Sequence, residues 1–118
     1  VDALAGVDFS GEDQDVVKDI LIDLTRRETR NFGTVFARNL IKEMRETTPM
    51  FKKPHQQAAF QVLEAPDVPS ALIELGFVSN EEDEKRLLSD DWRGEAAEAI
   101  QRAIDEFFEP RIAQKAVQ

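Results

Sequence analysis

The sequence predicts an α/β fold, in which this chain supplies a long helix, two strands and two C-terminal helices to a helix-covered sheet. Three observations predict it: a stripe of apolar residues at helical spacing, two short apolar runs separated by prolines, and two capped helical patterns at the end. Two strands are too few for an independent sheet with helices on both sides. We therefore expect the 118 residues to be the closing part of a larger α/β domain.

The long helix is predicted over roughly residues 13–47. An apolar residue recurs there on a four-residue step that is interrupted only by Glu28, and its members are Val16, Ile20, Leu24, Phe32, Phe36, Leu40 and Met44. Gly33 lies inside the pattern and costs about 1 kcal/mol relative to Ala. A break near residues 30–33 is therefore left open, and the Thr-Thr-Pro sequence at 47–49 ends the helix.

The two strands are predicted over Phe60–Leu63 and Ala71–Phe77, after a loop at 49–59 that contains two prolines and the only histidine. Pro66 and Pro69 separate the two apolar runs. The second run does not alternate between apolar and polar residues, which is typical of a strand that is buried on both faces.

The last two helices are predicted from their capping residues. Ser79 and Asn80 are N-cap candidates for a short helix that ends at about Leu88, and the acidic residues 81–84 favour its first turn. A final helix begins at residues 89–91, and Pro110 ends or bends it. Its predicted buried face consists of Trp92, Ala96, Ala99, Ile100, Ala103, Ile104, Phe107 and Phe108.

The composition excludes several classes of function. The chain has 15 basic and 24 acidic residues and a formal charge of −9, which disfavours nucleic acid and anionic membrane surfaces as partners. It has no cysteine, so disulfides and thiolate metal sites are excluded. No apolar run reaches the roughly 20 residues of a membrane span. Because the chain begins at Val1, without a signal peptide, we expect an upstream part.

Glu74 is the strongest candidate for chemistry, because it is an ionisable carboxylate within the most apolar segment of the chain. A carboxylate in such a place is usually paired, bound to a cation, or ready for proton transfer. At the C-terminal end of a strand in an open α/β sheet, it would face the crevice where ligands bind. The alternative is a carboxylate that simply reaches water or an arginine.

Metal ligands are not apparent in the sequence. His55 is the only imidazole, and no cluster offers His with Glu or Asp at the spacing of a catalytic zinc site, which normally takes three protein ligands. We therefore interpret His55 as a surface or supporting residue. The acidic run at 81–84 lacks the alternating oxygen ligands and the central glycine of a calcium loop, and helix capping explains it better.

The segment Ala65–Lys85, APDVPSALIELGFVSNEEDEK, closely resembles a signature of the zinc-dependent N-acetylmuramoyl-L-alanine amidases of the amidase-3 type. The elements that match are Pro69, Ser70, Glu74, Gly76, Phe77, Ser79 and Asn80, and the resemblance extends over residues 54–108. It implies a twisted, mostly parallel sheet flanked by helices. It also implies hydrolysis of the amide between N-acetylmuramic acid and the L-alanine of the stem peptide of peptidoglycan.

By this resemblance, Glu74 is the catalytic carboxylate, and Zn²⁺ is held by two histidines and a glutamate from segments upstream of this chain. The chain alone, which lacks those ligands, is then expected to be inactive. The resemblance also implies that residues 1–118 form the C-terminal part of a single catalytic domain, in which 16–118 belong to the body of the fold. Residues 1–48 resemble the periplasmic, cell-separation branch of the family, and by this resemblance we expect residues 1–15 to form the end of its regulatory insertion. Part of that insertion in the branch is a helix that covers the active site until a LytM-like activator displaces it.

Two other hypotheses remain open. The chain could be a non-catalytic binding or regulatory module, in which the long amphipathic helix docks on a partner and the amidase-like sheet is only a scaffold. A small, purely structural helical domain is the other possibility, and it leaves Glu74 within an apolar strand unexplained. The sequence immediately before Val1 discriminates between an enzyme and a binding module, because only an enzyme requires the metal ligands there.

Overall fold

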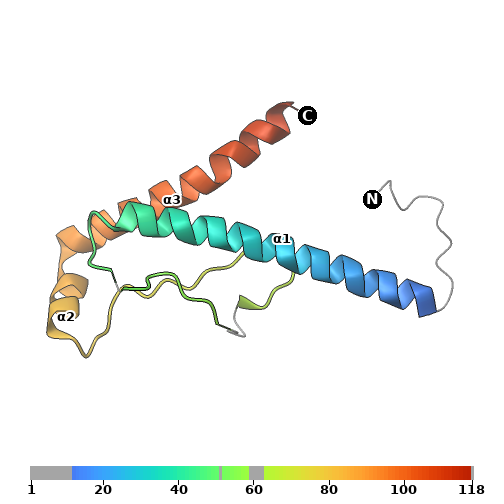
Figure 1. The fold of residues 1–118 in the computed structure, drawn as a ribbon. Coiled ribbons are helices and arrows are strands. Elements are labelled where there is room, and N and C mark those ends of the chain that lie inside the picture. The colour runs from blue at the N-terminus through green and yellow to red at the C-terminus, as the bar shows by residue number, and fades with distance from the viewer. Residues whose placement is uncertain (1–11, 51, 59–62, 118) are drawn as a thin grey trace.

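The computed structural model describes residues 12–50, 52–58 and 63–117, and the regular elements in these residues are all helices (Figure 1). They are α1 (Glu12–Met44), α2 (Glu81–Leu88) and α3 (Asp90–Val117). The three predicted helices are therefore confirmed, with the middle one at the predicted position. The predicted strands are not, because no strand occurs in the described part of the chain.

Helix α1 runs without a break through Gly33 for 33 residues. It ends in a turn, in which the backbone N–H groups of Thr47 and Thr48 both donate to the carbonyl of Met44, at 3.2 and 2.9 Å. These bonds satisfy a carbonyl that the helix itself leaves open at its C-terminus. The Thr-Thr-Pro sequence thus ends the helix as predicted.

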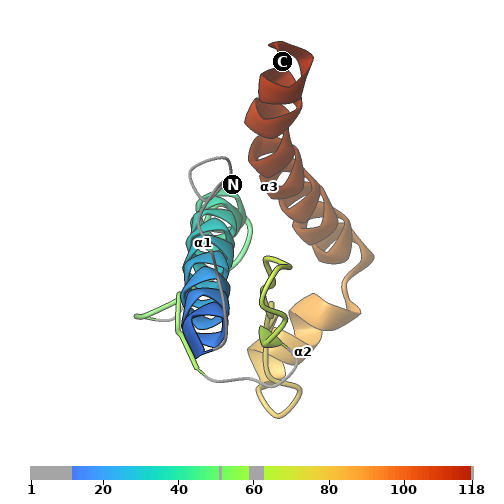
Figure 2. The same cartoon turned by 90° about the vertical axis from the view of Figure 1, so that its right-hand side faces the viewer.

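The second half of α1 packs against α3 in antiparallel orientation (Figures 1 and 2). The buried hydrophobic residues of the described part of the chain all lie on these two helices, and they are Leu40, Met44, Trp92, Ala96, Ala99, Ala103 and Phe107. The predicted apolar stripe is therefore packed against α3 in its second half and exposed in its first half. Its members from Phe32 onward lie against α3, whereas Val16, Ile20 and Leu24 are 52–57% exposed.

Aromatic rings and ion pairs extend the contact between α1 and α3. The ring of Phe107 meets those of Phe32 and Phe36 edge-on, at centroid distances of 6.4 and 5.6 Å. Two ion pairs join the same helices: Lys42 with Glu106 at 2.8 Å, and Arg102 with Glu43 at 2.8 Å. The contact therefore has an apolar centre with charged pairs at its margin.

The buried face of α3 is smaller than the sequence predicts. Ile104 and Phe108 are 39% and 51% exposed, so their assignment to the buried face was wrong. Pro110 does not end the helix, which continues to Val117. The helix tolerates this proline at the cost of one backbone hydrogen bond, since proline has no N–H.

The segment 71–77, predicted as the second strand, has no regular structure. It follows a stretch of chain that runs along α1: the hydroxyl of Thr29 donates to the carbonyl of Pro66 at 2.8 Å, and a Cβ on Gly33 would lie 3.3 Å from the carbonyl oxygen of Ser70. A helix cannot pair with a strand, because its own backbone groups are already bonded to one another. Residues 60–62 of the first predicted strand lie outside the described residues, and Leu63 is not in a strand.

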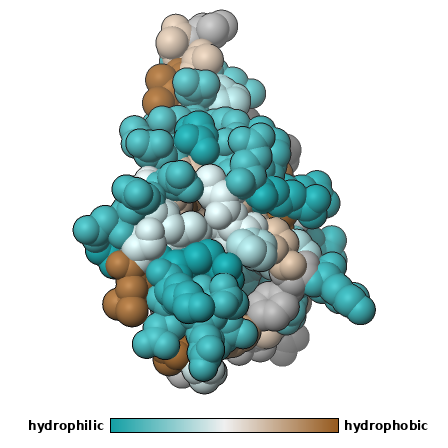
Figure 3. Space-filling view, turned by 90° about the vertical axis from the view of Figure 1, so that its left-hand side faces the viewer, coloured by the Kyte–Doolittle hydropathy of each residue, from teal (hydrophilic) through white to brown (hydrophobic). Residues whose placement is uncertain are grey.

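The molecule is elongated, with extents of 62 × 36 × 21 Å and a radius of gyration of 19.5 Å. A compact domain of this length has a radius of gyration of about 13–14 Å. The face at the α2 end is mostly hydrophilic (Figure 3), whereas exposed apolar residues gather on the first half of α1 and along 72–78. None of the helices in the described residues is both long and apolar enough to span a membrane.

Candidate functional site

Glu74 lies between two anchored positions of the chain. On one side, Ile73 packs against the buried cluster of α1 and α3, which contains Met44 and Trp92. On the other side, the backbone N–H of Phe77 donates to the Asp83 carboxylate at 3.0 Å. The Glu74 side chain itself is exposed. The segment therefore presents a carboxylate at the surface from a backbone that is held before and after it.

The expected burial of Glu74 is not found in this chain. Its neighbours Leu72 and Leu75 are also exposed, by 52% and 36%. The sequence placed these residues in a strand covered on both faces, and the described residues supply neither the neighbouring strands nor that cover. The catalytic role of Glu74 does not depend on burial within this chain alone, and it stays a prediction.

The turn after Glu74 is closed by three hydrogen bonds at the start of α2. The N–H of Asn80 donates to the carbonyl of Phe77, the N–H of Asp83 donates to the side chain of Asn80, and the N–H of Phe77 donates to Asp83, each at 3.0 Å. Asn80 is the N-cap of α2, as the sequence predicts. Asp83 differs from the usual capping-box residue, because its carboxylate bonds to Phe77 instead of to the N-cap N–H.

The electrostatics of the turn favour a charged Asp83. The hydrogen bond from the Phe77 N–H, followed by that from Arg86, lowers the pKa of the Asp83 carboxyl below its ordinary value. Both donors favour the charged form. Sequence reasoning treated Asp83 only as one acid in a helix-capping run. Its position three residues after Asn80 was the available signal for a more specific contact.

Gly76 allows the turn to approach α2 closely. A Cβ at this position would lie 3.1 Å from the Cβ and 3.2 Å from the Cγ of Asp83, which is closer than real Cβ atoms normally approach another atom. Any side chain here would push the turn and the Asp83 carboxylate apart. The glycine two residues after Glu74 therefore favours this close contact, which a side chain would keep only if Asp83 moved by a few tenths of an ångström.

The described residues do not provide a set of ligands that could hold zinc. They include no group of three or more His, Asp or Glu residues that could hold a metal ion. His55 is exposed in the loop at 52–58. The acidic run at 81–84 forms the first turn of α2, and this agrees with its interpretation as helix capping.

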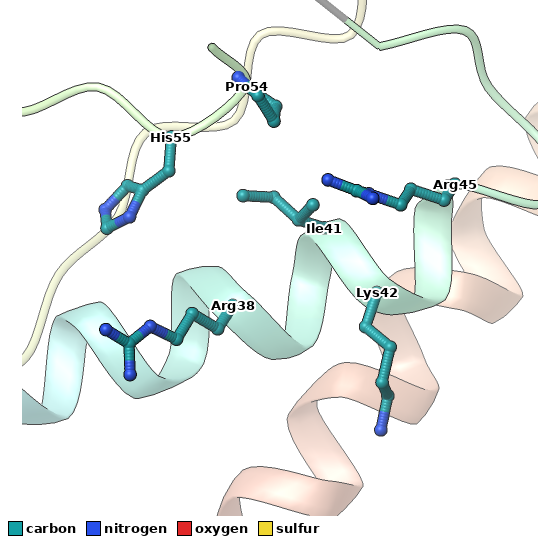
Figure 4. Close-up of a pocket in the computed structure, with 6 residues that line it drawn as sticks. All are labelled: Arg38, Ile41, Lys42, Arg45, Pro54 and His55. Atoms are coloured by element: carbon teal, nitrogen blue, oxygen red, sulfur yellow. The ribbon is translucent and has the colours of Figure 1, made fainter. Parts of the chain in front are cut away.

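His55 instead borders a shallow basic hollow of about 480 Å³ beside the end of α1 (Figure 4). Its lining consists of Arg38, Ile41, Lys42, Arg45, Pro54 and His55. The Lys42 side chain points away from His55 in Figure 4 and binds Glu106 on α3. The sequence analysis did not single out Arg38 and Arg45, although their spacing of seven residues places them on one helix face.

Comparison with known proteins gives one consistent result. A family model described as N-acetylmuramoyl-L-alanine amidase matches residues 12–106. The chain is 32% identical over 107 residues to N-acetylmuramoyl-L-alanine amidase AmiC of Escherichia coli, which covers 91% of this chain and 25% of that protein. It is 30% identical over 107 residues to AmiA of E. coli K12, which covers 91% of this chain and 37% of the relative.

A third relative is AmiC of Neisseria meningitidis, which is 30% identical over 114 residues, with 97% of this chain and 27% of that protein covered. The chain thus spans between a quarter and somewhat more than a third of the length of these curated relatives. No solved structure gives a significant match.

Proposed function

The chain belongs to the N-acetylmuramoyl-L-alanine amidase family, and on that premise we propose that it is part of an enzyme that hydrolyses the amide between N-acetylmuramic acid and the L-alanine of the peptidoglycan stem peptide. The observation that carries the proposal is the family match over residues 12–106, which includes Glu74 in its signature segment. The anchoring of the chain on both sides of Glu74 supports it, because a catalytic carboxylate must be held in place.

Glu74 acts as the general base and general acid in this proposal. Amide hydrolysis requires a group that takes a proton from the attacking water and delivers a proton to the leaving amine nitrogen. A carboxylate can perform both steps in turn, first as the base and then as the acid. In this account the rest of the segment, from Ile73 to Phe77, holds the carboxylate in place.

The zinc ion of the family is assigned to residues outside this chain, since the described residues do not form a ligand set. The chemistry that zinc supplies when it is bound is activation of water and polarisation of the scissile carbonyl. The 118 residues on their own are then inactive, because they contain the Glu74 carboxylate while the described residues contain no set of zinc ligands.

The proposal places the enzyme in the cell envelope, where its substrate lies. Curated relatives include amidases of Escherichia coli and Neisseria meningitidis, and this supports a location in the cell envelope. A periplasmic location and a role in cell separation are proposed from the sequence resemblance alone. Autoinhibition that a LytM-like activator relieves is likewise proposed only from the resemblance of the N-terminal part of the sequence to that branch of the family. Residues 1–11 of the proposed regulatory insertion lie outside the described residues, and α1 is continuous across its proposed end at residue 15.

The proposed function is tested by identifying which bond of peptidoglycan the full-length protein cleaves. Full-length protein incubated with purified peptidoglycan should release stem peptides that carry a new N-terminal L-alanine amine, without new reducing sugar ends. Amine labelling followed by mass spectrometry of the soluble products distinguishes the two results. Release of sugar ends alone, or of peptides cut at another amide, would contradict the proposal.

The role of Glu74 is tested by Glu74→Gln in the full-length protein. The variant should lose release of stem peptides and keep its zinc, because glutamine preserves the shape of the side chain and removes its basicity. Glu64→Gln is the matched control, since Glu64 is also an exposed carboxylate in a segment without regular structure. Undiminished hydrolysis by Glu74→Gln would refute the catalytic role.

A non-catalytic docking module is the second candidate. It is favoured by one observation: Val16, Ile20 and Leu24 form an exposed apolar stripe on the first half of α1, and such stripes dock into grooves of partner proteins. If the full-length protein binds no zinc and hydrolyses no peptidoglycan, this candidate replaces the enzyme. Two histidines and a glutamate at family spacing upstream of Val1 would reject it.

A further inference from the structure

The first turn of α2 reaches back towards the segment that bears Glu74. The contact involves Asp83, three residues after the N-cap Asn80, and the backbone of Gly76 and Phe77. Ordinary capping explains the bond from the Asp83 N–H to the Asn80 side chain. It does not explain why the Asp83 carboxylate binds the N–H of Phe77, which lies before the cap.

The contact fixes the chain just after Glu74. Phe77 is bonded through both of its backbone groups: its N–H donates to Asp83, and its carbonyl accepts from the N–H of Asn80. Gly76 fits against Asp83 so closely that a Cβ would be 3.1 Å away. With Ile73 packed on the buried cluster, the three residues from Glu74 to Gly76 span two fixed points.

We propose that Asp83 is a positioning residue for Glu74, which acts through the backbone N–H of Phe77 and the close approach at Gly76. This inference rests on the proposed function, because it concerns the catalytic use of Glu74. Asp83 need not touch substrate. Its carboxylate sets where the backbone of the Glu74 segment lies, and thereby where the Glu74 carboxylate meets the substrate amide.

A neighbouring acid allows the positioning role to be separated from general support of α2. Glu82 also lies in the first turn of α2, where an acid favours the helix, and its carboxylate pairs with Lys85 at 3.2 Å. Arg86 donates to the other oxygen of Asp83. Glu82→Ala therefore removes a first-turn charge, and Arg86→Gln removes the other partner of Asp83, while both leave an acceptor for Phe77.

The experiment compares Asp83→Ala, Asp83→Asn, Glu82→Ala and Arg86→Gln in the full-length protein. Misplacement of a catalytic group by about 1 Å can cost up to about 100-fold in rate. We expect Asp83→Ala to lower kcat about 10- to 100-fold with KM within about twofold. Asp83→Asn should restore most of kcat, because its amide oxygen can still accept from Phe77. The two controls should keep the parental kcat.

Hydrogen–deuterium exchange of the peptide that contains Phe77 gives a readout without substrate. Exchange should rise in Asp83→Ala and stay at the parental level in Glu82→Ala. A parental kcat in Asp83→Ala would overturn the inference, as would an equal loss in Glu82→Ala. If Asp83→Ala does not fold, a loss of kcat in Asp83→Asn as large as that in Glu74→Gln would overturn it. An inactive parent protein would instead contradict the proposed function, and that is seen before any variant is compared.

Discussion

Trp92 connects the end of α1 to the start of α3. Its indole N–H donates to the carbonyl of Thr47 at 3.1 Å, and its ring is only 7% exposed beside Met44 and Ala96. The Thr47 carbonyl lies just beyond α1, where backbone acceptors lack helical partners. One side chain thus fills the core and satisfies an acceptor at a helix end.

Trp92→Phe is expected to destabilise the 118-residue chain by about 1–3 kcal/mol, because phenylalanine keeps much of the apolar contact but leaves the Thr47 carbonyl without its donor. Urea unfolding followed by circular dichroism measures the change. Val78→Ala, at a residue that is 83% exposed, should change stability by less than about 0.5 kcal/mol. Equal effects of the two substitutions would contradict the account.

The Asp83 carboxylate gives stability a dependence on pH. Its pKa in the folded chain is lowered, first by the hydrogen bond from Phe77 and then by that from Arg86. A lowered folded-state pKa means that the stabilisation is complete above the unfolded pKa and is lost as pH falls through the folded value. The pKa of Glu43 is also lowered, chiefly by the hydrogen bond from Arg102.

As pH falls below neutral, the free energy of unfolding should therefore decrease more steeply in the parent chain than in Asp83→Asn or Glu43→Gln. The decrease should be shallowest in the double variant. Thermal unfolding at a series of pH values below neutral measures the slopes. Since Asp83 and Glu43 lie in different contacts, their effects should add. Identical slopes in all four proteins would show that neither contact contributes.

At the scale of elements, the helices could be predicted because their signals are local. The four-residue apolar step from Val16 to Met44 and the Asn80 cap lie within the elements that they specify. The strands could not be predicted from local signals in the same way, because a strand requires a neighbour. The run at 71–77 has no strand beside it among the described residues, and it follows a segment that packs on α1. The sequence therefore located the Glu74 segment but not its structure in this chain.

The contact between α1 and α3 depends on small residues on one face of α3. Ala99 and Ala103 are fully buried, at 0% exposure, whereas Ala97 on the same helix is exposed. Ala99→Leu should destabilise the chain by about 1–3 kcal/mol, because three added carbons must displace packed neighbours. Ala97→Leu is the matched control and should be nearly neutral. Urea denaturation followed by Trp92 fluorescence compares the variants, and equal midpoints would contradict the packing.

At the scale of the whole molecule, the described chain is elongated and leaves apolar surface uncovered. The radius of gyration of 19.5 Å exceeds that of a compact domain of this size, and apolar side chains stay exposed on the first half of α1 and along 72–78. The sequence predicted a larger domain from two strands that the described residues do not form, so membership in a larger domain stays a prediction. The sequence could not predict which surfaces are left uncovered, because that depends on contacts between residues far apart in the chain.

Zinc content tests the division of the site between this chain and the rest of the protein. After dialysis against zinc and then buffer, the 118-residue chain should retain far less than one ion per molecule, because its described residues hold no ligand cluster. The full-length protein should retain about one ion. Elemental analysis measures both. Stoichiometric zinc on the 118-residue chain would contradict the assignment of the ligands to other segments.

The central claim is that Glu74 serves a metal site that other segments of the protein complete. The most direct test is a crystal structure of the full-length protein with zinc bound, in which the position of the Glu74 carboxylate is measured. The account predicts that a Glu74 oxygen lies within hydrogen-bond reach, about 2.6–3.2 Å, of a water molecule on the zinc ion. A Glu74 carboxylate that points into bulk solvent, too far from the metal for one water to bridge them, would contradict it.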